Sequence, residues 1–165
     1  MDSTLTRWIP AVRKSGLRKL VGSGDRIALF TLPVVAVGLA MYANDPSRFA
    51  VDGSSRATRV AAGIGLAGGV AIWAWSVGLI LAKVPRGELI TTGPFAIVKH
   101  PLYTSVGLLV LPSVGFLLGT WLGALIGVTV YAGSRMFAPA EDAELSATFG
   151  EAWEAYRHSV KLPRL

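Results

Sequence analysis

The chain has 165 residues, 52% of them hydrophobic and 16% charged, and its mean hydropathy of +0.53 excludes an ordinary water-soluble domain. The net charge of +6 does not indicate a nucleic-acid partner, because no nucleic-acid-binding motif is present and six of the sixteen basic residues form a cluster directly before the first apolar window. The absence of cysteine excludes disulfides, thiolate metal ligands and a cysteine nucleophile.

Residues 1–26 are predicted to form a basic amphipathic segment on the membrane surface. A helix is expected from about residue 11 to residue 21, with Trp8 and Leu17 dipping into the interface. A cluster of basic residues next to a membrane span is typical of a cytoplasmic anchor on anionic lipid. The cluster comprises Arg7, Arg13, Lys14, Arg18, Lys19 and Arg26.

Three windows without Asp, Glu, Lys or Arg indicate membrane-spanning helices. Windows 27–44 and 60–82 have 18 and 23 residues, near the roughly 20 that cross a hydrocarbon core. Window 101–134 has 34 residues, which suits two short spans joined by a tight turn. We therefore predict an all-α polytopic membrane protein with four transmembrane helices in residues 27–138. The spans are expected at 27–43, 60–83, 101–118 and 122–137.

Small residues are expected to let these helices pack closely. Gly65 and Gly69 form a small-xxx-small pair in the second span. Trp73 and Trp75 lie too deep for interfacial residues, so we expect them to pack between helices or to line a cavity. Around the turn of the predicted hairpin, glycines recur every four residues, at positions 115, 119, 123 and 127.

The distribution of charge predicts the orientation of the chain. Four crossings put both termini and the loop 84–100 on the same side of the membrane. Basic residues in and beside this loop, Lys83, Arg86 and Lys99, indicate that this side is the cytoplasm. The loop 44–59, which contains both acidic and basic residues, is then expected on the outer side.

Residues 139–165 are predicted to form a cytoplasmic amphipathic helix that begins near Pro139 and ends at Pro163. A helix lying on the membrane surface, with its acidic residues serving only as first-turn charges, explains most of this pattern. It does not explain Glu141, which lies on the apolar stripe four residues before its first member. An inward carboxylate needs a cationic partner, so Glu141 is a candidate site residue. The stripe is Leu145, Phe149, Trp153, Tyr156 and Val160.

The stretch KHPLYTSVG places polar groups at the start of the third span. Pro101 disfavours helix at the residue before it, so the span is expected to begin there. His100, Tyr103 and Gly107 then follow at helical spacing on one face. With the backbone of the TTGP turn and the carboxylate of Glu141, this arrangement suits a zwitterionic cofactor that carries a positive centre.

Two segments, ELITTGPFAIVKHPLYTS and EDAELSATFGEAWEAYRHSVKLP, resemble the integral membrane methyltransferases related to isoprenylcysteine carboxyl methyltransferase and the phospholipid N-methyltransferases. Their pattern is roughly G-P-Y, then R-H-P-x-Y, then, after a helical hairpin, E-E-x-x-L-x-x-x-F-G-x-x-Y-x-x-Y and a terminal proline. The resemblance covers about residues 88–163. It implies S-adenosylmethionine as cofactor, bound on the cytoplasmic side under the C-terminal helix. The positions that it implies for cofactor binding are Gly93, His100, Pro101, Leu102, Tyr103 and Glu141.

The chain departs from this pattern at several positions: Lys99 replaces arginine, Phe95 and Trp153 replace tyrosines, and Asp142 replaces the second glutamate. The carboxyl-methylating branch is expected to have an arginine one turn before the first glutamate, where this chain has Phe137. Arg135, two residues earlier, is the candidate for substrate binding.

The resemblance implies in-line transfer of the sulfonium methyl group to a lipophilic acceptor that enters from the bilayer. Orientation of the reactants and exclusion of water should supply most of the rate. An amine or thiol acceptor must lose a proton, for which Glu141 and His100 are the candidate catalytic residues. The acceptor itself is left open among phospholipid amines, prenylated thioether acids, small thiols and isoprenoids.

Two other functions fit parts of the sequence. An NADPH-dependent membrane reductase of the steroid-reductase type is expected to have H-P-N-Y-x-G-E, where this chain has Leu102, Ser105 and Val106 at the differing positions. A non-catalytic membrane subunit with a polar mouth for a partner protein would have much the same sequence.

Overall fold

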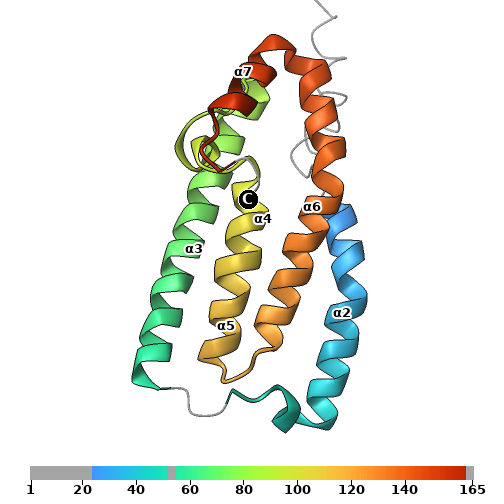
Figure 1. Ribbon diagram of the computed structural model, residues 1–165, viewed down its shortest axis with the longest axis vertical. Coiled ribbons are helices and arrows are strands. Elements are labelled where there is room, and N and C mark those ends of the chain that lie inside the picture. The colour runs from blue at the N-terminus through green and yellow to red at the C-terminus, as the bar shows by residue number, and fades with distance from the viewer. Residues whose placement is uncertain (1–23, 52–54, 163–165) are drawn as a thin grey trace, which may run out of the picture.

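The computed structural model describes residues 24–51 and 55–162 (Figure 1). Within these ranges the regular structure is helical, apart from one isolated antiparallel bridge between Ala50 and Thr120. The prediction of an all-α chain is therefore confirmed. Most of the expected membrane-surface segment and the predicted stop at Pro163 lie outside the described residues.

Long helices run side by side (Figure 1). They are α2 (Gly24–Asn44), α3 (Arg56–Lys83) and α6 (Leu122–Phe149). A segment formed by α4 (Pro101–Ser105), a π turn (Val106–Val110) and α5 (Leu111–Leu117) runs between α3 and α6. Helix α2 packs on the other side of α6.

Two of these helices, α2 and the helical segment Arg56–Arg86, are long and apolar enough to cross a membrane. Only 17% and 11% of their most apolar windows are buried, so most of their apolar side chains face outward. The third segment, Pro101–Leu117, is apolar but shorter. The presence of four membrane spans stays a prediction.

Glycines bring the helices into close contact, as predicted. An added Cβ at Gly65 would lie 2.6 Å from the Ser113 hydroxyl, and one at Gly69 would lie 2.8 Å from the Cβ of Leu109. In the hairpin, a Cβ at Gly127 would lie 2.2 Å from the carbonyl oxygen of Gly107. Because the last of these neighbours is a backbone atom, a larger residue there would force the two helices apart.

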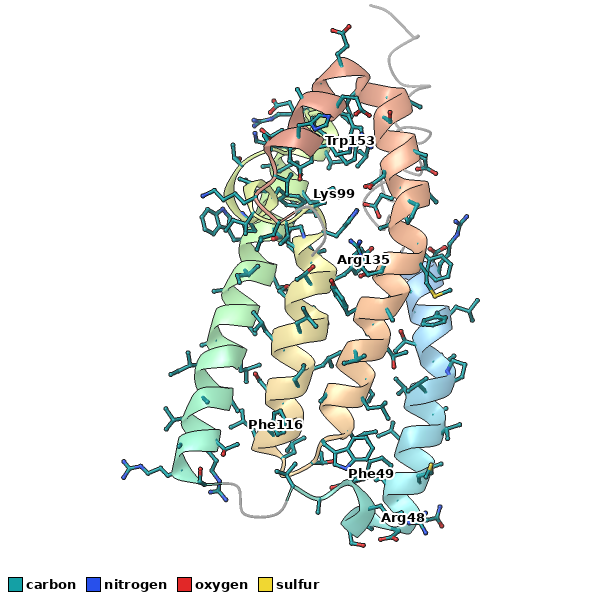
Figure 2. All side chains as sticks on the ribbon, viewed as in Figure 1. Arg48, Phe49, Lys99, Phe116, Arg135 and Trp153 are labelled. Carbon is teal, nitrogen blue, oxygen red and sulfur yellow. The ribbon has the colours of Figure 1, made fainter. Side chains whose placement is uncertain are left out.

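The chain between α2 and α3 is attached to the turn of the hairpin. A short 3₁₀ helix, η2 (Pro46–Phe49), leads into the bridge at Ala50. The Trp121 ring N–H donates to the carbonyl oxygen of Arg48 at 3.0 Å, and the rings of Phe49 and Trp121 lie 4.9 Å apart. These contacts close the end of the bundle opposite to α7 (Figure 2).

The expected C-terminal helix is in fact divided between two helices. Helix α6 passes through Pro139 and ends at Phe149, and α7 runs over Glu151–Ser159. The prediction of a new helix near Pro139 is wrong, because a proline inside a helix removes one hydrogen bond without always ending the helix. The break comes at Gly150, whose φ of 52° and ψ of −123° lie in a region that favours glycine.

Candidate functional site

The candidate site is at the end of the bundle where α7 lies. It is formed by the loop from Val84 to His100, the start of α4 and the end of α6 (Figure 1). The loop contains two short 3₁₀ helices, η3 (Val84–Arg86) and η4 (Gly93–Ala96). Lys99 and Trp153 are both found at this end (Figure 2).

Gly93 fixes the start of the second of these turns. Its φ of +64° is a conformation that other residues rarely adopt, and an added Cβ would lie 3.1 Å from atoms of Trp75 and Leu79. The loop therefore lies closely against α3. Trp75 itself is 60% exposed, which rules out the first of its two predicted arrangements, packing between helices.

The apolar stripe of the C-terminal region forms a small hydrophobic core instead of an exposed face. Trp153, Tyr156 and Val160 are at most 5% exposed, and Leu145 and Phe149 from the same stripe pack against them. Leu89 of the loop joins the cluster. The predicted stripe of a single helix is therefore divided between α6 and α7, and its members meet in one cluster although the break at Gly150 falls inside the stripe.

Hydrogen bonds also hold α7 and the following residues against the loop. The Tyr156 hydroxyl donates to the carbonyl oxygen of Phe95 at 2.9 Å, and the backbone N–H of Leu162 donates to the carbonyl oxygen of Ile97 at 2.8 Å. Burial, with a smaller contribution from the charge of Asp142, raises the pKa of Tyr156 to about 12. Its phenol therefore stays protonated at neutral pH and remains a donor.

Asp142 joins α6 to the two residues before Pro101. Its carboxylate forms an ion pair with the Lys99 ammonium and lies 3.2 Å from Nε2 of His100. The three side chains are 22%, 12% and 9% exposed, in the order Asp142, Lys99 and His100. The sequence indicated Asp142 only as a departure from a family pattern. The sequence does contain a signal that Asp142 faces the site. Asp142 precedes Leu145 and Phe149 by three and seven residues and therefore shares their helix face.

The pKa of Asp142 reflects these contacts. Burial alone would raise the pKa of the carboxyl group, but hydrogen bonds from His100 and Lys99 outweigh burial and hold the pKa below its usual range. The contact therefore stabilises the folded protein at neutral pH. Its contribution is lost as the pH falls through the lowered pKa of Asp142.

Glu141 has an inward carboxylate, as its place on the stripe predicted, but forms no ion pair with any residue of 24–51 and 55–162. Its Oε2 is buried and has no hydrogen-bond partner among these residues. The carboxylate is within electrostatic reach of the Tyr103 phenol at the start of α4. A buried carboxylate oxygen without a partner is costly, and a ligand that supplies a positive group or a hydrogen-bond donor would remove the cost.

An apolar cavity of about 440 Å³ extends from this end along the bundle. It is bounded by α2, α3, α4 and α6. Leu102 and Tyr103, two of the predicted cofactor-binding residues, line it, and so does Trp73, as predicted. The full lining is Gly24, Ile27, Ala28, Thr31, Leu32, Val35, Trp73, Leu102, Tyr103, Val106, Ile126 and Val130.

Arg135 lies farther from Trp153 of α7 than Lys99 does (Figure 2). It precedes Asp142 by seven residues on α6, so it lies on the same helix face about two turns, or about 10 Å, away. Its side chain is exposed and forms no hydrogen bond or ion pair with another residue of the described ranges. Its role in substrate binding stays a prediction.

The remaining predicted residues gather at the same end of the bundle. His100 and Pro101 are buried at the start of α4, directly after the loop that contains Gly93. Among residues 24–51 and 55–162, no group of three or more His, Asp or Glu side chains is placed to hold a metal ion. Comparisons of the chain with protein-family models, curated proteins and solved structures gave no significant match.

Proposed function

We propose that this protein is an integral membrane methyltransferase that uses S-adenosylmethionine and modifies a lipophilic acceptor at the cytoplasmic face. One juxtaposition supports the proposal most directly. Lys99 and His100, from the loop before α4, lie against the end of α6 that carries Glu141 and Asp142. Beside these charges, Tyr103 lines an apolar cavity.

The side chains of this cluster suit the polar groups of the cofactor. The buried Oε2 of Glu141 accepts the α-ammonium group, and Lys99 and His100 donate to the carboxylate. Leu102 and Tyr103 provide apolar and aromatic surface near the cationic sulfur. When bound, S-adenosylmethionine supplies an electrophilic methyl group on a positively charged sulfur. The covering helix α7 and its core exclude water from the cluster.

The acceptor is expected to place its hydrocarbon part in the cavity. Most lining residues are apolar, and several, among them Leu32 and Trp73, belong to the outward-facing surface that would contact lipid. A chain can therefore reach Tyr103 from the side, without crossing water. If the acceptor is an amine or a thiol, Glu141 or His100 takes the proton that it loses. A carboxylate acceptor loses no proton.

Four membrane spans, with both termini and the candidate site in the cytoplasm, complete this proposal. The exposed apolar faces of α2 and α3 and the hairpin after Pro101 support it. Because successive spans would cross the membrane in opposite directions, the contact between η2 and the hairpin turn would lie outside the cell. The loop 84–100 would lie in the cytoplasm.

The natural absence of cysteine makes this topology directly testable. Single substitutions Arg48→Cys and Glu88→Cys introduce one thiol at each end of the bundle, both at exposed positions. With intact cells, a membrane-impermeant maleimide is expected to label position 48, while position 88 is labelled only after lysis. Labelling of both positions, or of position 88 alone, in intact cells would contradict the proposed orientation.

The cofactor is tested by calorimetric titration of the detergent-purified protein with S-adenosylmethionine, S-adenosylhomocysteine and NADPH. We expect both adenosyl compounds to bind, and we expect Glu141→Ala to weaken their binding at least tenfold, because a buried charged partner is lost. Glu144→Ala is the matched control, since Glu144 lies on the same helix but is exposed. Binding of NADPH alone would instead support a reductase, and binding of none of the three would support a non-catalytic subunit. Equal affinity in Glu141→Ala and wild type would contradict the assignment of the site.

A further inference from the structure

Lys99 and His100 together hold one carboxylate group, that of Asp142. They are consecutive residues before Pro101, so the start of α4 fixes both of them. Each contacts a different oxygen of the same carboxylate: the Lys99 ammonium contacts Oδ2 of Asp142, and His100 Nε2 lies 3.2 Å from Oδ1. Two donors, one on each oxygen, are a common way for proteins to hold a carboxylate. In this structure, the carboxylate comes from another helix of the same chain.

The cluster balances the net charge of the cofactor, but its donors for the cofactor's carboxylate are already in use. With His100 neutral, Lys99 contributes one positive charge, and Glu141 and Asp142 contribute two negative charges. A cofactor with one carboxylate, one ammonium and one sulfonium has a net charge of +1, which balances the sum. Glu141 can receive the ammonium, because its buried Oε2 has no hydrogen-bond partner in the part of the chain that the structure describes. The donors that suit the carboxylate are, however, already occupied by Asp142.

We propose that Asp142 is an internal competitor, which occupies the position of the ligand's carboxylate on Lys99 and His100 and is displaced when the cofactor binds. This inference rests on the function proposed above and adds a competition step to it. Asp142 belongs to α6, whereas α7 is held on the loop by its own hydrophobic cluster and by hydrogen bonds to Phe95 and Ile97. Displacement of Asp142 therefore frees Lys99 and His100 for the ligand while α7 stays in place over the site.

The test compares two ligands on three proteins. S-adenosylhomocysteine carries the amino-acid carboxylate, and 5′-methylthioadenosine lacks it. Both are titrated by calorimetry into wild type, Asp142→Asn and Glu144→Gln. Asparagine keeps the size of the side chain and removes the competing charge. Glu144→Gln removes one negative charge from the same helix at an exposed position, so it controls for the general electrostatic effect.

We expect Asp142→Asn to bind S-adenosylhomocysteine about tenfold more tightly than wild type, since a competing charge pair is removed. Its affinity for 5′-methylthioadenosine is expected to stay within about twofold, and Glu144→Gln should show no such selectivity. The single substitution Lys99→Gln should weaken the binding of S-adenosylhomocysteine and leave the binding of 5′-methylthioadenosine unchanged. This second variant keeps the test decisive if Asp142→Asn does not fold.

The outcomes separate the two proposals. If wild type binds S-adenosylhomocysteine and Asp142→Asn binds it equally or less tightly, the competitor role is overturned and the proposed function stands. An equal gain for both ligands, or a gain in Glu144→Gln as well, also overturns the competitor role. If neither wild type nor Asp142→Asn binds either compound, both proposals are overturned. Binding of S-adenosylhomocysteine by Asp142→Asn but not by wild type would support both.

Discussion

Replacing Gly123 with alanine is expected to lower the free energy of unfolding by about 1–3 kcal/mol, because the added methyl group has no room. A Cβ at this position would lie 2.3 Å from the carbonyl oxygen of Leu111 and 2.7 Å from the Cα of Gly115. Both neighbours are backbone atoms on the other half of the hairpin, so no side-chain rotation relieves the overlap. Thermal unfolding in detergent, followed by circular dichroism, measures the effect.

The control for this substitution is Gly78→Ala on α3. No atom lies within 4 Å of an added Cβ at Gly78, and alanine is favoured over glycine inside a helix by roughly 0.5–1 kcal/mol. Both substitutions add one methyl group, but we expect Gly123→Ala to lower the free energy of unfolding and Gly78→Ala to raise it. An unfolding midpoint for Gly123→Ala equal to or above that of wild type would show that the hairpin does not depend on this contact.

Replacing Trp153 with alanine is expected to cost about 3–5 kcal/mol of local stability, since this is the usual effect of removing a buried tryptophan. Trp153 is 3% exposed, its ring centre lies 5.3 Å from that of Tyr156, and Leu89 of the loop packs against this cluster. Loss of the ring should detach α7 from the loop. Hydrogen exchange in residues 151–159 should then accelerate, and binding of S-adenosylhomocysteine should weaken at least tenfold.

Arg157→Ala provides the comparison on the same helix. Arg157 forms an ion pair with Glu154 at 3.0 Å, but both side chains are about half exposed, so its removal should cost under about 1 kcal/mol. Unchanged exchange rates in Trp153→Ala would mean that the cluster does not hold α7. Faster exchange with unchanged ligand affinity would mean that the covering helix is not part of the binding site.

Local patterns predicted most of the helices. Windows without charge identified α2 and α3 to within four residues at each end, and the short interval between Leu118 and Leu122 predicted the hairpin. The spacing of glycines predicted where helices approach each other. These features depend on periodicity, composition and steric bulk, which can be read from neighbouring residues alone.

The division of the C-terminal region could not be predicted in the same way. Pro139 is common at the start of a helix and also tolerated inside one, and only the packing of the continuous α6 decides between these cases. Gly150 was the better boundary signal, but it lies inside an apolar stripe that runs on at helical spacing. The stripe residues still meet because Leu145 and Phe149 of α6 pack against the buried cluster that Trp153 and Tyr156 of α7 form.

The candidate site was predicted in its location but not in its contacts. Helical spacing indicated His100, Tyr103 and Glu141, and the hairpin brings them to one end of the bundle. The partner of His100 is nevertheless Asp142, the neighbour of Glu141, and the pairing spans 42 residues of sequence. Which of two adjacent carboxylates reaches the loop depends on the exact rotation of α6, and no local pattern specifies it.

The closed end of the bundle anchors the start of α6. Contacts from Arg48, Phe49 and Ala50 hold the hairpin turn where this helix begins. Asp142 lies 20 residues beyond Leu122, or about 30 Å along the axis at 1.5 Å per residue. If α6 tilted by about 5° about this anchored end, the Asp142 carboxylate would move by about 2.6 Å, a distance comparable to the length of an ion pair. A small change in the direction of α6 beside Trp121 would therefore alter the contact between Asp142 and Lys99 at the other end of the bundle.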